Sequence, residues 1–403
     1  MTPRNNYLLA TSTWFLAYGM QSVVFAWLVT IVLREPAELV GWAQTALLLP
    51  GMLFILLAGV LADRIGPDRQ ALYAQLAAAL IPWLLIAAIY AGWMSFPVML
   101  IYAVLMGLVQ AFVTPARDGL LNHVSGSRIQ HTVLLTSLCQ FGFQIVGYAI
   151  AAFADRLGAS VVLAMQSFCL LLGVLAYQRI RRSGIVESQP RTTDSVLQSV
   201  LQGAKTVAGS PVMRTVVIQN VAMALFFMGC FIVCFPLAVR EVFNGSSSSL
   251  GLLNGLNSAG LALTILVMLR IGYVKRAGRA LLVAQALGSI VLILSGSVES
   301  FPVFVMLVFC WGLCGGAAMP MSRTMMQELA PPAQRARVMS FYAFSFMGAG
   351  PIGTLFAGYL SELVGPQMAI QICGALMLTV VLLVGLTSTL WRENFEPASA
   401  GAG

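Results

Sequence analysis

The chain has 403 residues, of which 59% are apolar and only 9% are charged. A soluble domain carries about a quarter charged residues, so this chain has too little polar surface to be enclosed by water. The net charge of +8 does not indicate nucleic-acid binding, because the basic residues form short clusters between long apolar stretches, as orientation signals do.

Long apolar stretches follow one another along the whole chain. A helix needs about 20 apolar residues to cross the hydrocarbon core of a bilayer, and the first stretch, 7–33, is too long for the core of a signal peptide. Twelve stretches qualify as spans: 7–33, 39–62, 71–92, 97–116, 132–154, 159–178, 212–239, 250–270, 279–296, 301–322, 338–361 and 367–390. They predict an all-α membrane protein with twelve transmembrane helices.

The basic residues predict the orientation of these spans. With both termini in the cytoplasm, only three of the 22 lysines and arginines fall outside, namely Arg34, Arg156 and Arg240. Positive residues stay on the inner side of a membrane, so the pattern predicts a multi-pass protein of the cytoplasmic (inner) membrane.

The longest connection between spans divides the chain into parts. We expect an N-terminal six-helix bundle at 1–178, a cytoplasmic linker at 179–211, a C-terminal six-helix bundle at 212–391 and a cytoplasmic tail at 392–403. A short amphipathic helix on the inner membrane surface is predicted in the linker, and a flexible linker is the alternative. Its apolar face would hold Val196, Leu197, Val200, Leu201 and Ala204.

Spans four and ten begin similar segments. The order Gly107-Leu108, Pro115, Arg117 and a polar loop recurs about 205 residues later as Gly312-Leu313, Pro320, Arg323 and a polar loop. The recurrence indicates a duplicated six-span unit, although a chance match between apolar segments is the alternative. Secondary transporters are built from such repeats, with the substrate site near the bilayer midplane between them.

The inner loop between spans two and three reads Gly59-Val-Leu-Ala-Asp63-Arg64-Ile-Gly66-Pro67-Asp68-Arg69. It resembles the signature loop of the major facilitator superfamily, with Arg69 one position late. The physical interpretation is that Gly59 permits close helix contact and that Asp63 accepts hydrogen bonds from the N-terminus of span eleven.

The resemblance implies a fold of two pseudo-symmetric bundles and a latch that stabilises the outward-facing state. The alternative is that the arginines only anchor the loops in the membrane. The expected latch residues are Gly59, Asp63, Arg64, Gly66, Arg69, Arg117, Asp118, Arg323 and Arg337.

Two further loops, from Pro115 and from Gln334, resemble those of bacterial drug exporters and the enterobactin exporter. Span eleven also carries Gly348-Ala-Gly350-Pro351-Ile-Gly353, which is similar to an antiporter motif that family exporters usually carry in span five. In this chain span five has Gly147 followed by Tyr148 instead of proline, a departure that weakens the assignment to export.

Polar and aromatic residues within the spans are the candidates for a substrate cavity, since polar groups in membranes usually face the bundle interior. Bonding between neighbouring helices is the alternative for each of them. They are Trp14, Tyr18, Gln21, Phe25, Gln110, Gln140, Gln144, Asn220, Phe226, Phe227, Asn254, Asn257 and Trp311.

Enzyme chemistry and metal binding find no support in the residues. The seven cysteines lie in apolar stretches without acidic or histidine partners, so no metal and no cofactor is expected. An intramembrane enzyme would need a nucleophile and a base at depth, whereas both histidines, His123 and His131, lie at an inner loop.

The acids also lie in loops or at span ends, with Asp118 the nearest to a span's interior, so the buried carboxylate common in proton coupling cannot be named. We expect a monomeric transporter that works by alternating access, has a small-molecule substrate and lipid as partners, and exports a lipophilic drug-like or siderophore-like molecule with possible proton coupling. An uptake transporter and a non-transporting receptor or scaffold are the alternatives.

Overall fold

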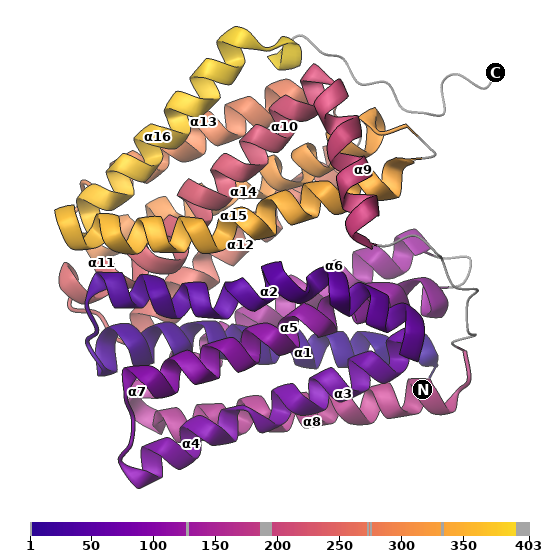
Figure 1. Ribbon diagram of the computed structural model, residues 1–403. Helices are drawn as coiled ribbons and strands as arrows, with labels where there is room; N and C mark the ends of the chain where they lie inside the picture. Colours follow the sequence, from indigo (N-terminus) through magenta and orange to yellow (C-terminus); the bar gives the residue numbers. More distant parts are fainter. Residues whose placement is uncertain are drawn as a thin grey trace. The chain divides into compact units, whose positions relative to one another are not determined.

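The computed structural model describes residues 2–125, 129–185, 196–271, 274, 276–331 and 334–391, and every regular element in these ranges is helical (Figure 1). By its internal contacts the chain forms two compact units. The first comprises Met1–Val196 and Asn244–Gly255, and the second comprises Leu197–Phe243 and Leu256–Gly403.

The first half of the chain supplies the helices up to Arg182. They are α1 (Pro3–Trp27) with its π-helical extension η1 (Leu28–Val32), α2 (Ala37–Ile65), α3 (Pro67–Leu80), α4 (Pro82–Ala91), α5 (Phe96–Ser125), α6 (Ile129–Ala151), α7 (Ala154–Leu157) and α8 (Ala159–Arg182).

The second half begins with the linker helix α9. Its helices are α9 (Val196–Gly209), α10 (Pro211–Ala222), the π-helical η2 (Met223–Met228) and η3 (Cys230–Cys234), α11 (Phe235–Glu241), α12 (Ser247–Ile271), α13 (Ala277–Ser295), α14 (Phe301–Leu329), α15 (Arg335–Val364), α16 (Pro366–Thr387) and the short η5 (Thr389–Trp391).

The helices follow the twelve predicted spans in order. Eleven stretches of the described residues are long and apolar enough to cross a bilayer, and α6 contributes a shorter apolar stretch, Leu135–Ala151. Span three is divided into α3 and α4 because Pro82, the first residue of α4, lacks the amide proton that would continue α3. Span seven runs through α10, η2, η3 and α11.

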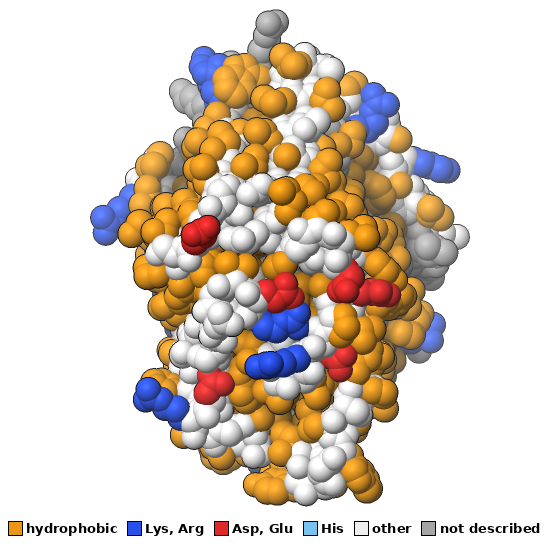
Figure 2. Space-filling view, turned by 90° about the vertical axis from the view of Figure 1, so that its left-hand side faces the viewer, with side chains coloured by type: hydrophobic (Ala, Val, Ile, Leu, Met, Phe, Trp, Pro, Cys, Tyr) orange, Lys and Arg blue, Asp and Glu red, His pale blue; other side chains and the backbone are white. Residues whose placement is uncertain are grey.

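Large apolar side chains make up much of the exposed surface, and Figure 2, which faces helix ends, shows acidic and basic side chains among the apolar ones there. Leu386, Leu363 and Tyr90 each expose more than three quarters of their surface. Such exposure would promote aggregation in water. It is favourable in lipid, so the surface fits the membrane environment predicted from composition.

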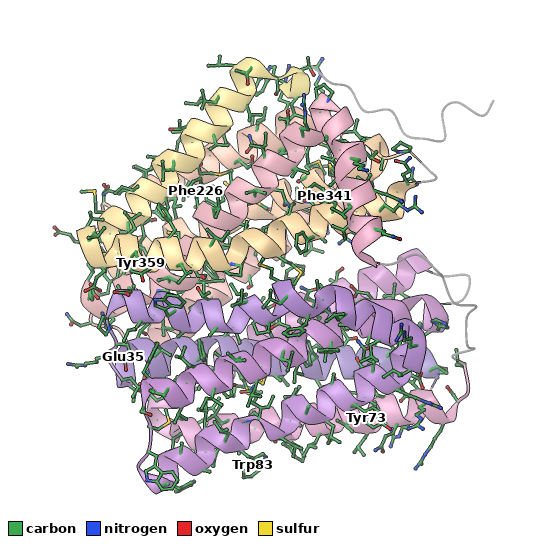
Figure 3. All side chains as sticks on the ribbon, in the orientation of Figure 1. Glu35, Tyr73, Trp83, Phe226, Phe341 and Tyr359 are labelled. Atoms are coloured by element: carbon green, nitrogen blue, oxygen red, sulfur yellow. The ribbon has the colours of Figure 1, made fainter. Side chains whose placement is uncertain are left out.

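Amide side chains of α3 join the helices of the first unit. Gln70 Nε2 donates to Ala58 O at 2.8 Å and Phe112 O at 2.9 Å, and Gln75 Nε2 donates to Leu170 O at 3.1 Å. On the neighbouring helix α4, Trp83 (labelled in Figure 3) donates to the Ser167 hydroxyl at 2.9 Å. Polar side chains stabilise membrane bundles through hydrogen bonds of this kind.

Glycines allow the closest helix contacts in both units. A Cβ at Gly19 of α1 would lie 2.4 Å from Gln144 O, and a Cβ at Gly147 of α6 would lie 2.3 Å from Leu16 O. In the second unit a Cβ at Gly229 would lie 2.3 Å from the carbonyl oxygen of Gly353. Spans one and five therefore meet through a glycine pair, as spans seven and eleven do.

A second pair of contacts recurs in the same way. A Cβ at Gly107 of α5 would lie 2.2 Å from Leu47 O of α2, and a Cβ at Gly312 of α14 would lie 2.3 Å from Asn257 O of α12. Spans four and two thus pack in the first unit as spans ten and eight pack in the second. These matched contacts agree with the recurrence seen in the sequence.

The helix expected in the linker is present as α9, and it packs on α15 through small residues. Val200 and Val207 are buried, and a Cβ at Gly203 would lie 2.1 Å from Arg337 O. The Thr206 hydroxyl also bonds Gln334 Oε1. Leu201, expected on the apolar face, is 53% exposed instead, because the buried face follows Val200, Gly203 and Val207. The tail 392–403 lies outside the described residues.

Candidate functional site

The inner loop between α2 and α3 is a sharp corner built on Gly66. Its amide donates to Ala62 O at 3.0 Å and closes α2, while its φ of +94° directs the chain into α3. A Cβ at Gly66 would lie 2.7 Å from Asp68 Oδ1. Only glycine combines this φ with the approach of the carboxylate, so the geometry explains the glycine in the signature loop.

The charged residues of this corner have different environments. Asp68 is 8% exposed, whereas the side chains of Arg64 and Arg69 are exposed. Asp63 lies in the last turn of α2, and its side chain is outside the described part of the structure. A Cβ at Gly59 would meet no described heavy atom within 4 Å.

Arg117 of α5 packs on the core of the first unit. Its guanidinium carbon lies 4.8 Å from the centre of the Phe15 ring of α1, a cation–π distance. Its Nε is 3.9 Å from Asp118 Oδ1, and the Asp118 side chain is 71% exposed. The contact of these two neighbours pairs the Asp118 carboxylate with a cation of the same helix. In the second unit, Arg323 is exposed and Arg337 is half-buried at the start of α15.

The aromatic and polar face predicted on α1 is mostly packed inside the first unit. Trp14, Gln21 and Phe25 expose 5% or less of their surfaces, and Tyr18 is half-buried. The Phe25 ring stacks on Tyr102 of α5 with ring centres 6.0 Å apart. Trp14, Gln21 and Phe25 therefore pack between α1 and neighbouring helices.

The predicted amides divide into two groups. Gln110, Gln140 and Gln144 are half-buried, and the Gln144 amide donates to the Tyr148 hydroxyl one turn further along α6. The three asparagines each donate to a backbone carbonyl oxygen.

Asn220 Nδ2 donates to Tyr342 O at 3.1 Å and Ser345 Oγ at 3.0 Å of α15. Asn254 donates to Leu250 O at 2.8 Å within α12, and Asn257 lies 3.5 Å from Val308 O of α14. For Asn220 and Asn257 this is the helix-joining alternative that the sequence left open.

Aromatic rings of span seven gather around Trp311 of α14. The ring centre of Trp311 lies 5.5 Å from that of Phe227, 5.6 Å from Phe231 and 5.7 Å from Phe235, and Phe304 supports Phe235 at 5.4 Å. These five residues form what we call the aromatic wall. Phe227, Phe235 and Phe304 are buried, whereas Phe231 and Trp311 are half-buried and remain accessible.

The π-helical backbone accompanies the aromatic wall. Segments η2 and η3 interrupt the α-helical ladder where Phe227 and Phe231 lie, and π-helical turns occur frequently at functional sites. Sequence analysis found Phe227 and Trp311 but missed Phe231, Phe235 and Phe304. The spacing of four between Phe227, Phe231 and Phe235 was the available signal. Phe226, labelled in Figure 3, packs instead on Phe356 of α15, with ring centres 6.0 Å apart.

Two compact helical units, close glycine contacts repeated in each, and the corner at Gly66 are the features of a transporter of the major facilitator superfamily. Within it, the chain belongs to the transmembrane secretion effector family, whose model matches residues 8–399. It is a multi-pass membrane protein of a family that transports small molecules.

A curated relative and several solved structures resemble the chain. It is 27% identical over 370 residues to the multidrug efflux pump Tap of Mycolicibacterium fortuitum, covering 86% of each chain. A point mutant of the nucleoside transporter NupG matches with a TM-score of 0.74 and 13% identity, over 96% of this chain and 99% of that one.

The human organic anion transporter MFSD10 has a TM-score of 0.66 and 17% identity, with 94% of this chain and 98% of that one covered. An inward-facing bacterial homologue of the lysosomal transporter Spinster has a TM-score of 0.68 and 12% identity, with 98% and 99% covered. At these identities the solved structures establish the fold alone.

Proposed function

We propose that this protein exports lipophilic, drug-like or siderophore-like molecules across the cytoplasmic membrane. The observation that carries the proposal is the aromatic wall. In it the rings of Phe231 and Trp311 are accessible, and they pack on the buried rings of the wall. Aromatic rings bind flat apolar groups by stacking and edge contacts, and they attract cations through their faces. The multidrug efflux pump among the relatives supports export.

The polarity of the transmembrane segments also supports such a substrate. The described acidic residues lie in loops or within about two turns of helix ends, as Asp118 does in α5 and Glu362 in α15. A charged or highly hydroxylated substrate would need polar partners at depth. An apolar or singly cationic aromatic molecule needs only the rings and the half-buried glutamines.

The signature corner is proposed to stabilise one state of the transport cycle. Asp63 would accept hydrogen bonds from the N-terminus of span eleven, while Gly66 and the packing of Asp68 hold the end of α2 in place. Arg117 has a buried Nη1 atom with no hydrogen-bond partner among the described residues, so it retains a donor that a latch carboxylate can use. The other predicted latch residues would add further contacts to the same latch. They are Gly59, Arg64, Arg69, Asp118, Arg323 and Arg337.

Transport would be secondary, by a monomer, without chemical change to the substrate and with both termini in the cytoplasm. Coupling to protons is the natural source of energy for export against a gradient. Labelling with a membrane-impermeant thiol reagent tests the topology, because cysteines placed in 179–211 must react only from the cytoplasmic side.

Vesicle transport tests both substrate class and direction. Ethidium, a flat aromatic cation, should accumulate in inside-out vesicles that contain the protein when a proton gradient is imposed. Trp311→Ala should raise the KM for ethidium. Trp93→Ala is the matched control, since Trp93 is 75% exposed in the loop between α4 and α5.

The alternatives predict different results in the same vesicles. Accumulation in right-side-out vesicles alone would establish uptake in place of export. A protein that inserts normally but moves ethidium and other aromatic cations in neither direction would contradict the proposed substrate class.

A further inference from the structure

A dense group of hydrogen bonds joins the turn after α6 to the start of α12, and both ends belong to the first unit. Ser247 N donates to Asp155 Oδ2 at 2.6 Å, and Asp155 N donates to Ser247 Oγ at 3.0 Å. The Ser247 hydroxyl lies 2.7 Å from Asp155 Oδ2 and 3.1 Å from Ala152 O, the two acceptors for its proton. We call this group the Asp155 cap.

The cap has the form of a helix N-cap supplied by another segment. Ser247 is the first residue of α12, where the amide protons have no partners inside the helix. A carboxylate satisfies such an amide and favours the positive end of the helix dipole. Ser247 is fully buried, while Asp155 is exposed, so water can reach the carboxylate if the contact opens.

Close packing continues the contact for one further turn of α12. A Cβ at Gly251 would lie 2.6 Å from Ala152 Cβ and 2.9 Å from Tyr148 O. The start of α12 is therefore seated against the end of α6. From Leu256 onward the same helix belongs to the second unit, so the chain of α12 begins in one unit and continues in the other.

We propose that Asp155 is a positioning residue of the transport cycle, whose cap holds the start of α12 on the α6–α7 turn and must release when the transporter opens on that side. The proposed topology places this side outside the cytoplasm. Alternating access moves one part of a transporter against the other. The start of α12 is held by the first unit, and the rest of the helix belongs to the second unit. When the second unit moves, α12 must therefore either break the cap or bend. The inference needs alternating access, but it does not depend on the direction of transport.

Reversible cross-linking tests the release directly. In Asp155→Cys with Ser247→Cys, oxidation with copper phenanthroline should join the two positions and reduce ethidium transport by about tenfold or more. Reduction with dithiothreitol should restore it, which excludes misfolding as the cause. A protease site inserted within 186–195 reports the disulfide on a gel, since the two positions then lie on different fragments.

The matched control pairs Asp155→Cys with Ser248→Cys. Ser248 is the next residue of α12, is exposed and bonds Ser246, so this pair should cross-link poorly, and oxidation should leave its own transport rate unchanged. Asp155→Ala should shift the balance between closed and open outer states about 2- to 30-fold towards open, the range expected for one lost cap. The shift is measured with a cysteine at position 247, which should be alkylated faster in the Asp155→Ala protein than in the protein that retains Asp155.

The results separate this inference from the proposed function. The inference would be overturned if the protein transported at its full rate while the gel showed that all of it carried the 155–247 disulfide. It would also be overturned if Asp155→Ala left the alkylation rate at position 247 unchanged. If the uncross-linked protein fails to move ethidium, the proposed substrate class fails, while the alkylation measurement still decides the role of Asp155.

Discussion

The contact between α1 and α6 makes a quantitative prediction for Gly147→Ala. The added Cβ would lie 2.3 Å from Leu16 O, 2.9 Å from Gly19 Cα and 3.0 Å from Met20 N. Ordinary van der Waals contact begins at 3.4 Å, so the two backbones must separate by about 1 Å, because none of these three atoms belongs to a flexible side chain.

Overpacking of this kind costs about 1–3 kcal/mol. For a unit of about 200 residues, this corresponds to a decrease in Tm of about 2–12 °C. The assay follows thermal unfolding in detergent by the reaction of a fluorogenic maleimide with the two half-buried cysteines of the same unit, Cys139 and Cys169.

Gly142→Ala is the control on the same helix. A Cβ at Gly142 meets no described atom within 4 Å, and alanine is favoured over glycine in a helix by up to about 1 kcal/mol. The Tm of this variant should stay constant or rise. Equal Tm values for Gly147→Ala and Gly142→Ala would refute the close packing on which the reasoning depends.

Three further substitutions test the corner, the latch and one asparagine. Gly66→Ala should cost about 1–3 kcal/mol, because its φ of +94° is unfavourable for alanine and its Cβ would meet Asp68, and the loss is measured as a lower Tm. Asp63→Ala should impair turnover in vesicles while membrane insertion stays intact, and normal transport by this variant would count against the latch. Asn220→Ala should lower the Tm by removing two hydrogen bonds to α15 worth about 1 kcal/mol each. A raised KM at unchanged Tm would instead place Asn220 in the substrate site.

The candidate site could be predicted only in part, and the reason lies in the environment of membrane helices. In water an apolar stripe marks the buried face of a helix, but in lipid all faces are apolar. The sequence could therefore identify Trp14 and Trp311 as aromatic residues within spans without distinguishing their surroundings. Trp14 packs among α3, α5 and α8, whereas Trp311 is half-buried beside Phe231.

The sequence by itself determined the twelve spans, the linker helix and the glycine corner at Gly66, because apolar length and local backbone conformation depend on neighbouring residues in the chain. The tertiary structure decided which polar groups are paired. Asn220 finds its acceptors 122 and 125 residues away, and Asp155 finds Ser247 92 residues away. Such partners are chosen by how helices pack, and local periodicity contains no information on that choice. The same holds for the aromatic wall, whose rings come from span seven and α14 and meet only in the folded bundle.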